Sequence, residues 1–423
     1  MKKFYIVISL FLCFLSPAQS NFLSSSGSYM LNYVSAPSLD TTDFTIMQIP
    51  FLSFELGTYS APKFSNFTSI RNNNFIIDIS EYEDKISEYA HHLIDFQTNI
   101  FTYTHKKGKN LYSYGITHRF FGEFFLSKDL VSLLVNGNYN SLNTRIDLRD
   151  DYAIGYNYLS VFFGYSKLIS KGIRLGTRLK LIKGINIIGV DNNNSSVLLT
   201  DDFSTPNNPF SIHVNSDFNF FTTTNSSVLN NLGCAIDLSF EKKISQYTIY
   251  THLLELGFVS WMEDQSISKG ELHFDGINYD SSQDLITEFN SLYDTIIDVF
   301  DFEERHDVKS LRLLPFYFNI GVNKQFYNSL NNVNVNYNVK KLYKGILHTG
   351  TISYTHSFPD YHLSFTPQYS FNRFHYINIG MVIHKSWGEI LHTSMFIDNI
   401  IGTVSDNIRS SRFGFGINFY LLF

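Results

Sequence analysis

The sequence predicts an all-β fold, a transmembrane antiparallel β-barrel of about 14 strands with short helices in its extracellular loops. Aromatic residues make up 17% of the 423 residues, and such barrels use aromatic side chains on the lipid face and at both membrane interfaces. The mean hydropathy is only -0.07, and beyond the N-terminus no apolar run reaches about eighteen residues, which excludes a helical membrane protein. Apolar residues instead recur with a period of two, as in strands whose two faces meet different surroundings.

Residues 1–20 have the features of a secretory signal peptide. Lys2 and Lys3 precede an apolar segment at 4–15, and small residues at 18–20 suit a cleavage site. We therefore expect export, with the mature chain in the bacterial outer membrane.

The mature chain is expected to have two parts. Residues 21–41 are predicted to form a periplasmic tether or a small plug, and residues 42–423 are predicted to form the barrel. Without the signal peptide Cys234 is the single cysteine, so no intrachain disulfide is expected.

The predicted strands are segments in which apolar and polar residues alternate. Pro50 cannot donate to a strand ladder, so a bulge or break is expected there, and muddled alternation predicts a second bulge within 247–262. The predicted strands are 42–59, 93–105, 110–126, 151–168, 172–190, 231–243, 247–262, 311–324, 333–341, 345–357, 361–371, 374–385, 389–401 and 412–423.

The strand at 412–423 alternates most clearly and ends on Phe423. A last strand that ends in an aromatic residue is typical of outer-membrane barrels, and Phe423 is predicted to be read by the barrel-insertion machinery as an assembly signal. We expect this strand to close the barrel against the first. The alternative is an ordinary strand of a soluble sandwich.

The connections favour the barrel because they sort by length. Short turns are expected at 106–109, 169–171, 244–246, 326–332, 358–360 and 386–388. Long connections are expected at 60–92, 127–150, 191–230 and 263–308, and all four fall on the opposite side from the short turns. The segment 191–230 is interpreted as one long loop with local strand pairing. A soluble sandwich has no reason to sort its loops in this way, so the long connections are predicted to lie outside the cell.

Two of the long connections are predicted to contain helices. The first is 80–93, where Ile86, Ala90 and Leu93 recur at helical spacing. The second is 284–300, a mouth helix with an apolar stripe that needs a packing partner, either the rim of the barrel or the other loop helix. The alternative is simple loop packing without a role in solute entry. The stripe consists of Leu285, Phe289, Leu292, Ile296 and Val299.

Charged residues on two predicted strands are expected to line the lumen. Arg174, Arg178 and Lys180 share one face of their strand, opposite leucines and isoleucines. Facing lipid would cost about 2–4 kcal/mol for each Arg or Lys at the midplane, so they should point inward, as should Asp237 and Glu241. They form either a solvated, salt-bridged interior or a path for a ligand or ion.

No motif for catalysis or cofactor binding is present. His91 and His92 are adjacent, which does not bring their side chains together on a helix, and no G-x-S-x-G or phosphate-loop motif occurs. The net charge of -6 gives no nucleic-acid signal. We therefore expect no enzyme activity, no cofactor and no metal.

Three segments resemble one protein family. They are 164–184, with the kernel Gly176-x-Arg178-x-Lys180-x-Ile182-x-Gly184, and the later blocks 254–261 and 396–400. They resemble an uncharacterised Bacteroidota outer-membrane barrel family, a domain of unknown function that is similar to FadL-type transporters of long-chain fatty acids and other hydrophobic compounds. The resemblance implies a transport barrel, although the long N-terminal plug of that type has no counterpart in residues 21–40.

Two functions follow from these expectations. The first is passive, porin-like transport of hydrophobic or small amphiphilic solutes, which a continuous aromatic-lined lumen would favour. The alternative is a non-transporting barrel that anchors or assists a secretion or surface assembly through its long external loops, which a lumen filled by side chains would favour. The expected partners are outer-membrane lipid and lipopolysaccharide, the insertion machinery and, for the first function, a hydrophobic solute. No nucleic acid is expected, and the barrel should be a monomer.

The sorting of the connections predicts their sidedness. An epitope tag inserted at Asn194, within a long connection, should be labelled on intact cells by an antibody. The same tag inserted in the short turn at 169–171 should be labelled only after permeabilisation. Labelling of the Asn194 tag only after permeabilisation would contradict this topology.

Overall fold

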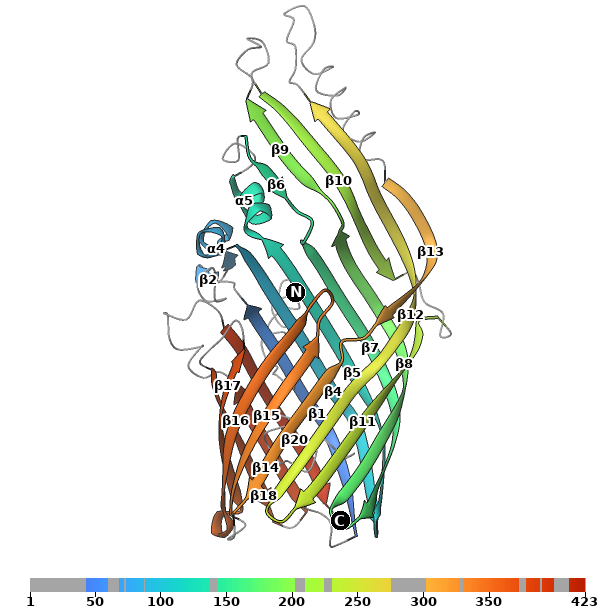
Figure 1. The fold of residues 1–423 in the computed structure, drawn as a ribbon, viewed down its shortest axis with the longest axis vertical. Coiled ribbons are helices and arrows are strands. Elements are labelled where there is room, and N and C mark those ends of the chain that lie inside the picture. Colours follow the sequence, from blue (N-terminus) through green and yellow to red (C-terminus); the bar gives the residue numbers. More distant parts are fainter. Residues whose placement is uncertain are drawn as a thin grey trace, which may run out of the picture.

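The computed structural model describes residues 43–59, 68–71, 74–86, 88–136, 143–201, 210–223, 230–274, 302–326, 330–372, 378–388, 390–398 and 411–422. Within these residues the chain forms a tall antiparallel sheet whose strands are tilted to the long axis of the molecule (Figure 1). None of the helices in the described ranges is long and apolar enough to cross a membrane.

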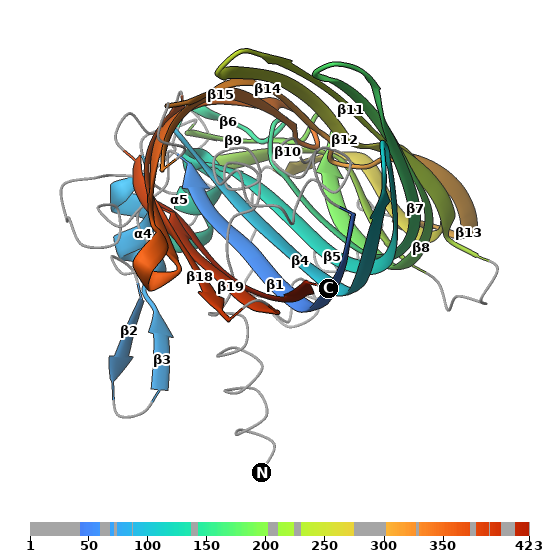
Figure 2. The same cartoon turned by 90° about the horizontal axis from the view of Figure 1, so that it is seen from below.

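Fourteen of the described strands form a closed ring. Figure 2 views the ring from one end. Each strand pairs antiparallel with the next, and β20 pairs with β1, so the ring has no free edge. The prediction of about 14 strands is confirmed. In ring order the strands are β1 (Phe44–Tyr59), β4 (Tyr89–Lys107), β5 (Asn110–Ser127), β7 (Tyr152–Ser170), β8 (Ile173–Asn192), β11 (Leu232–Ile244), β12 (Tyr247–Phe274), β14 (Tyr317–Gln325), β15 (Asn331–Lys341), β16 (Ile346–Phe358), β17 (Leu363–Asn372), β18 (Asn378–Trp387), β19 (Leu391–Asp398) and β20 (Ser411–Leu422).

The period of two in the sequence becomes the two faces of this wall. On β8 the side chains of Leu179 and Leu181 are 60% and 73% exposed on the outside, whereas Arg174 and Lys180 are 3% and 6% exposed on the inside. In water this arrangement would expose the apolar side chains, but in a bilayer the exposed face meets lipid tails. The outer surface is therefore the lipid-facing surface.

The two ends of the barrel differ. At the end called here the turn end, tight turns join neighbouring strands. At Gly172 the backbone has φ of 81°, and a Cβ would lie 2.6 Å from the carbonyl oxygen of Lys243, so this position requires glycine. The opposite end, called the loop end, carries the long connections.

At the loop end part of the wall rises into a tall curved sheet (Figure 1). It contains β9 (Ser196–Asp201), β10 (Phe210–Thr223), the upper part of β12 and β13 (Phe302–Leu313), with β6 (Arg145–Asp147) paired to β9. The local pairing expected in 191–230 is confirmed as β9 and β10. The boundaries expected for the connection at 263–308 are wrong at both ends, because β12 continues to Phe274 and β13 begins at Phe302.

Two short helices and a hairpin lie beside the wall near the loop end (Figure 2). They are α4 (Ile79–Lys85), α5 (Lys128–Asn136) and the pair β2 (Thr68–Arg71) and β3 (Asn74–Ile77). Tyr82 of α4 packs with Ile86, Ala90 and Val131, and burial raises the pKa of its hydroxyl above the ordinary value. The Tyr82 hydroxyl therefore stays protonated, and it lies 2.6 Å from Nε2 of His92.

The helix predicted at 80–93 is wrong in length. It ends at Lys85, and Ile86 is already extended, with φ of -72° and ψ of 135°. Ala90 and Leu93 belong to β4, whose backbone pairs with β1 and β5, and this pairing overrides the helical spacing of the apolar residues. The helix α5 was not predicted, and the mouth helix at 284–300 lies outside the described residues.

The prediction of one continuous strand at 311–324 is wrong. β13 ends at Leu313 and β14 begins at Tyr317, because Pro315 between them has no N–H for a strand ladder.

Two predicted bulges are confirmed. The register of β1 against β20 shifts around Pro50. The register of β11 against β12 shifts between Ile236 and Leu238, where Glu255 on β12 has φ of 61°. Bulges re-aim side chains, and this second one has consequences for the lumen.

Ring closure can be tested by cross-linking. Ser53 pairs with Gly416 across β1 and β20, and antiparallel partners have Cα atoms about 4.5–5.5 Å apart, within disulfide range. In a Cys234→Ser background, Ser53→Cys with Gly416→Cys should form an oxidised species with altered migration on non-reducing gels. Ser53→Cys with Arg412→Cys, about 13 Å out of register, should not. Equal cross-linking of both pairs would contradict the closure register.

Candidate functional site

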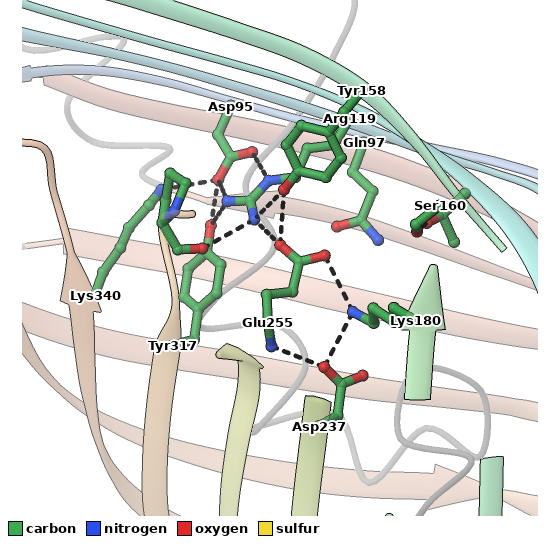
Figure 3. Close-up of polar contacts among 12 residues, drawn as sticks. Asp95, Gln97, Arg119, Tyr158, Ser160, Lys180, Asp237, Glu255, Tyr317 and Lys340 are labelled. Carbon is green, nitrogen blue, oxygen red and sulfur yellow. Dashed lines mark hydrogen bonds and ion pairs between the residues drawn. The ribbon is translucent and has the colours of Figure 1, made fainter. Parts of the chain in front are cut away.

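A group of charged and phenolic side chains from several strands makes polar contacts inside the barrel (Figure 3). Each is 8% exposed or less. We call this group the central ion network, and it consists of Asp95 on β4, Arg119 on β5, Tyr158 on β7, Lys180 on β8, Asp237 on β11, Glu255 on β12, Tyr317 on β14 and Lys340 on β15.

Arg119 is the hub of the central ion network. Its Nε and Nη2 each donate to Asp95 at 2.8 Å, in a bidentate pair. Its Nη1 donates to Glu255, to the Tyr158 hydroxyl at 3.3 Å and to the carbonyl oxygen of Pro315 at 3.3 Å. Only the planar fork of an arginine can serve so many acceptors at once, so lysine would not replace it.

The network joins opposite walls of the barrel. Lys340 Nζ lies 3.0 Å from Oδ2 of Asp95, and the Tyr317 hydroxyl donates to the same carboxylate. β4 and β15 are seven steps apart in the ring of fourteen strands, whichever way it is followed. Side chains therefore span the lumen from one side to the other at this level.

A second branch of the network runs through Glu255. Lys180 Nζ lies 3.1 Å from a carboxylate oxygen of Glu255 and 3.1 Å from one of Asp237. The backbone N–H of Glu255 donates to Asp237 at 2.7 Å. The left-handed backbone at Glu255 is the bulge described above, and the network satisfies both its carboxylate and its N–H.

The same bulge accompanies a change in the partner of β12. Leu254 is the last residue of β12 that pairs with β14, and Phe258 is the first in the ladder with β13. Pro315 lies in the break between β13 and β14, and its carbonyl oxygen accepts from Arg119. The network therefore holds the interrupted part of the wall in place.

An apolar layer lies directly above the network, toward the loop end. On six of the chain segments that carry the network, the next inward-facing residue is apolar and belongs to one buried cluster, which also includes Trp261 and Phe221. These six residues are Leu93, Phe121, Tyr156, Ile182, Ala235 and Leu342.

Below the network, toward the turn end, the inward face of β14–β18 carries amides and hydroxyls. These side chains are 6% exposed or less, and none of them is ionisable. We call this surface the neutral panel, and it consists of Asn319, Asn336, Asn338, Thr349, Thr351, Ser370, Asn372 and Asn378. On the side of β14–β18 the lumen thus has three layers with different chemistry.

The turn between β15 and β16 makes further contacts across the lumen. The backbone N–H of Tyr343 donates to Glu123 Oε2 on β5 at 2.7 Å, and its hydroxyl donates to Asp191 on β8 at 2.9 Å. Lys344 Nζ lies 2.5 Å from Asp191, and Glu123 also accepts from the Tyr152 hydroxyl at 2.5 Å. This turn lies against the opposite wall instead of standing free at the rim.

The residues predicted to line the lumen are all buried or nearly so on the inner face. Lys180 and Asp237 belong to the network, and Arg178 Nη1 lies 3.4 Å from Asp237. Arg174 and Glu241 face each other in the register of β8 and β11, nearer the turn end. The stripe of the mouth helix and Phe423 lie outside the described residues.

Sequence reasoning missed Asp95, Arg119, Glu255 and Lys340. None of them has another charged residue two positions away on its strand, unlike Arg178 and Lys180 on β8. The adjacent pair His91 and His92, considered for metal ligation, separates in β4, where His91 Nε2 lies 3.0 Å from Glu123. Among the described residues, no three His, Cys, Asp or Glu side chains converge as metal ligands do.

Comparison with known proteins identifies a family. The model of a family of unknown function (DUF5723) matches residues 37–391. No curated protein has a detectably similar sequence.

Three of the solved structures with a similar arrangement come from Pseudomonas and Ralstonia. They are the Pseudomonas putida toluene transporter TodX (9% identity, 96% of this chain and 97% of that chain, TM-score 0.44), the Ralstonia pickettii toluene transporter TbuX (9%, 90% and 88%, 0.42) and a Pseudomonas aeruginosa FadL homologue (8%, 97% and 95%, 0.43). At these identities and TM-scores the similarity carries no argument about function.

The role of Arg119 can be tested by unfolding. Arg119→Met leaves Asp95 and Glu255 buried with fewer partners, and breaking a buried pair costs about 3–5 kcal/mol of unfolding free energy. We expect a large fall in the urea concentration at the midpoint of unfolding. Unfolding is monitored by tryptophan fluorescence in detergent micelles. Arg305→Met removes an exposed pair with Glu303 and should leave the midpoint unchanged. If Arg119→Met unfolds at the same urea concentration as the parent protein, Arg119 is not a stabilising hub of the network.

Proposed function

The chain belongs to the DUF5723 family of unknown function, and we propose that it is an outer-membrane barrel for the passive transport of small amphiphilic solutes. The observation that carries this proposal is the layered lumen. An apolar, aromatic layer lies at the loop end, the central ion network forms a charged constriction in the middle, and the amides and hydroxyls of the neutral panel lie below. A solute with an apolar part and a hydrogen-bonding part has complementary surface on both sides of the constriction.

The outer-membrane location is supported by the wall. A closed ring pairs its backbone groups without water, which a bilayer requires, and the exposed outer side chains are largely apolar. The predicted signal peptide agrees with export. Together these features favour the outer membrane over the periplasm.

Transport requires the constriction to open, and Lys340 is its most movable part. Arg119 is held by bonds to three or more groups, whereas Lys340 reaches Asp95 from the opposite wall on a flexible four-carbon stem. Asp95 keeps its bidentate partner when Lys340 withdraws. We therefore propose that the Lys340 side chain moves and acts as the gate, while Arg119 keeps its position.

A second function is supported by a different observation. The side chains that span the lumen, together with the tall sheet of β9, β10, β12 and β13, also suit a barrel that does not conduct and that anchors a surface or secretion assembly. In that case the network would serve only to stabilise the barrel. Solute flux separates the two functions.

The gate is tested in proteoliposomes by osmotic swelling in phenyl β-glucoside, a solute with an aromatic ring and sugar hydroxyls. Lys340→Ala shortens the side chain that crosses the lumen, so we expect swelling at least about threefold faster than with the parent protein. Lys340→Arg keeps a long cation, which can still reach Asp95, and should swell at close to the parental rate.

Two results would contradict the proposal. If neither the liposomes with the parent protein nor those with Lys340→Ala swell, transport is ruled out and the anchoring function is supported. Equal swelling for all three proteins would show that Lys340 is not the gate. Heat-modifiable gel migration serves as the control that each protein is a folded barrel.

A further inference from the structure

The neutral panel has a regular geometry. Asn336 pairs in register with Thr351, Thr351 with Ser370, and Ser370 with Asn378, so these four inward side chains form one row across β15, β16, β17 and β18. A second row lies next to it, toward the network, and contains Asn319, Asn338, Thr349 and Asn372. Two rows of short polar side chains therefore cover the inner face of five adjacent strands.

Several of these buried groups lack a hydrogen-bond partner. Asn319 donates to Asn338, which donates to Asn336 at 2.8 Å, and this chain leaves Asn319 Oδ1 unpaired at one end. At the other end the Asn336 side chain lies beside the Tyr250 hydroxyl. Thr351 Oγ1 and Asn378 Oδ1 are also unpaired. Buried polar groups in proteins are nearly always paired, so the unpaired groups of the panel need an explanation.

Hydroxyls elsewhere on the inner wall show two patterns. Some pair with each other, as Thr117 does with Ser160 at 2.5 Å and Thr355 with Thr366 at 2.8 Å, whereas the hydroxyls of Thr102, Thr104 and Ser113 lack a partner. The neutral panel differs in combining unpaired amide oxygens, on Asn319 and Asn378, with an unpaired hydroxyl on Thr351. Such groups fit a molecule that can donate and accept at closely spaced positions.

The location of the panel relates it to the gate. Asn338 and Asn319 are the next inward-facing residues below Lys340 and Tyr317 on the same strands. A solute that passes the constriction therefore meets the neutral panel first. Because the panel has no ionisable side chain, it offers no charge complementarity to an ion.

We infer that the neutral panel is a binding site for the hydroxyl-bearing part of an uncharged solute, such as a sugar ring. This inference rests on the proposed transport function and names the chemical class of its solute. The ring hydroxyls donate to the free acceptors Asn319 Oδ1 and Asn378 Oδ1. The Thr351 hydroxyl can donate to the ring or accept from it.

Binding is measured by saturation-transfer NMR with methyl β-glucoside and the detergent-solubilised protein. The parent should transfer saturation to the sugar protons, with a dissociation constant obtained by titration. Thr351→Val with Asn378→Leu removes an unpaired hydroxyl and an unpaired carbonyl, and binding should weaken at least about fivefold, since one lost hydrogen bond is worth about two- to tenfold. The matched control, Thr117→Val with Ser160→Ala, removes two inner-wall hydroxyls that pair with each other, and should bind as the parent does.

The outcomes separate the binding site from the transport function. Sugar binding that is absent in the parent, or equal in the two double variants, overturns the inferred site. Equal binding of glucose 6-phosphate overturns the uncharged class. Sugar binding that depends on Thr351 and Asn378, in a protein whose liposomes do not swell, supports the site and overturns transport.

Discussion

The interior of this barrel depends on one guanidinium group. Arg119 holds Asp95 on its own side of the lumen and Glu255 on another strand, and it also binds the Pro315 carbonyl oxygen. Burying an ion in a medium of low polarity is costly unless its partners are arranged in advance, and here they are supplied by three separate parts of the wall. The position of these strands relative to one another therefore follows from the requirements of a single side chain.

That requirement explains an irregular stretch of an otherwise regular wall. A bulge at Glu255 and a break at Pro315 both interrupt the ladder around β12, and each by itself would weaken the sheet. The bulge turns a carboxylate toward Arg119, and the break frees a carbonyl oxygen for the same group. The local loss of strand pairing is offset by charge-assisted hydrogen bonds inside the lumen.

The distribution of side chains inside the barrel is as informative as the network itself. The ionisable groups of the central ion network lie at one level, an apolar cluster lies above, and the amides and hydroxyls of the neutral panel lie below. A barrel that only needed to be filled could use apolar side chains throughout, as soluble cores do. Buried polar atoms without partners, such as Thr351 Oγ1, indicate a surface prepared for contact with something outside the chain.

The sequence by itself determined the class of fold and the direction of most side chains. The period of two identified nearly all wall strands, and the cost of charge in lipid assigned Arg178, Lys180 and Asp237 to the interior, because both depend only on near neighbours along the chain. Only the tertiary structure decided which interior charges meet. Asp95 and Lys340 are 245 residues apart, and their contact depends on ring closure, on the register of every strand between them and on the bulge beside Glu255. Local alternation specifies the face of a strand but not its height against the opposite wall, so the network, its gate and the neutral panel required the folded barrel.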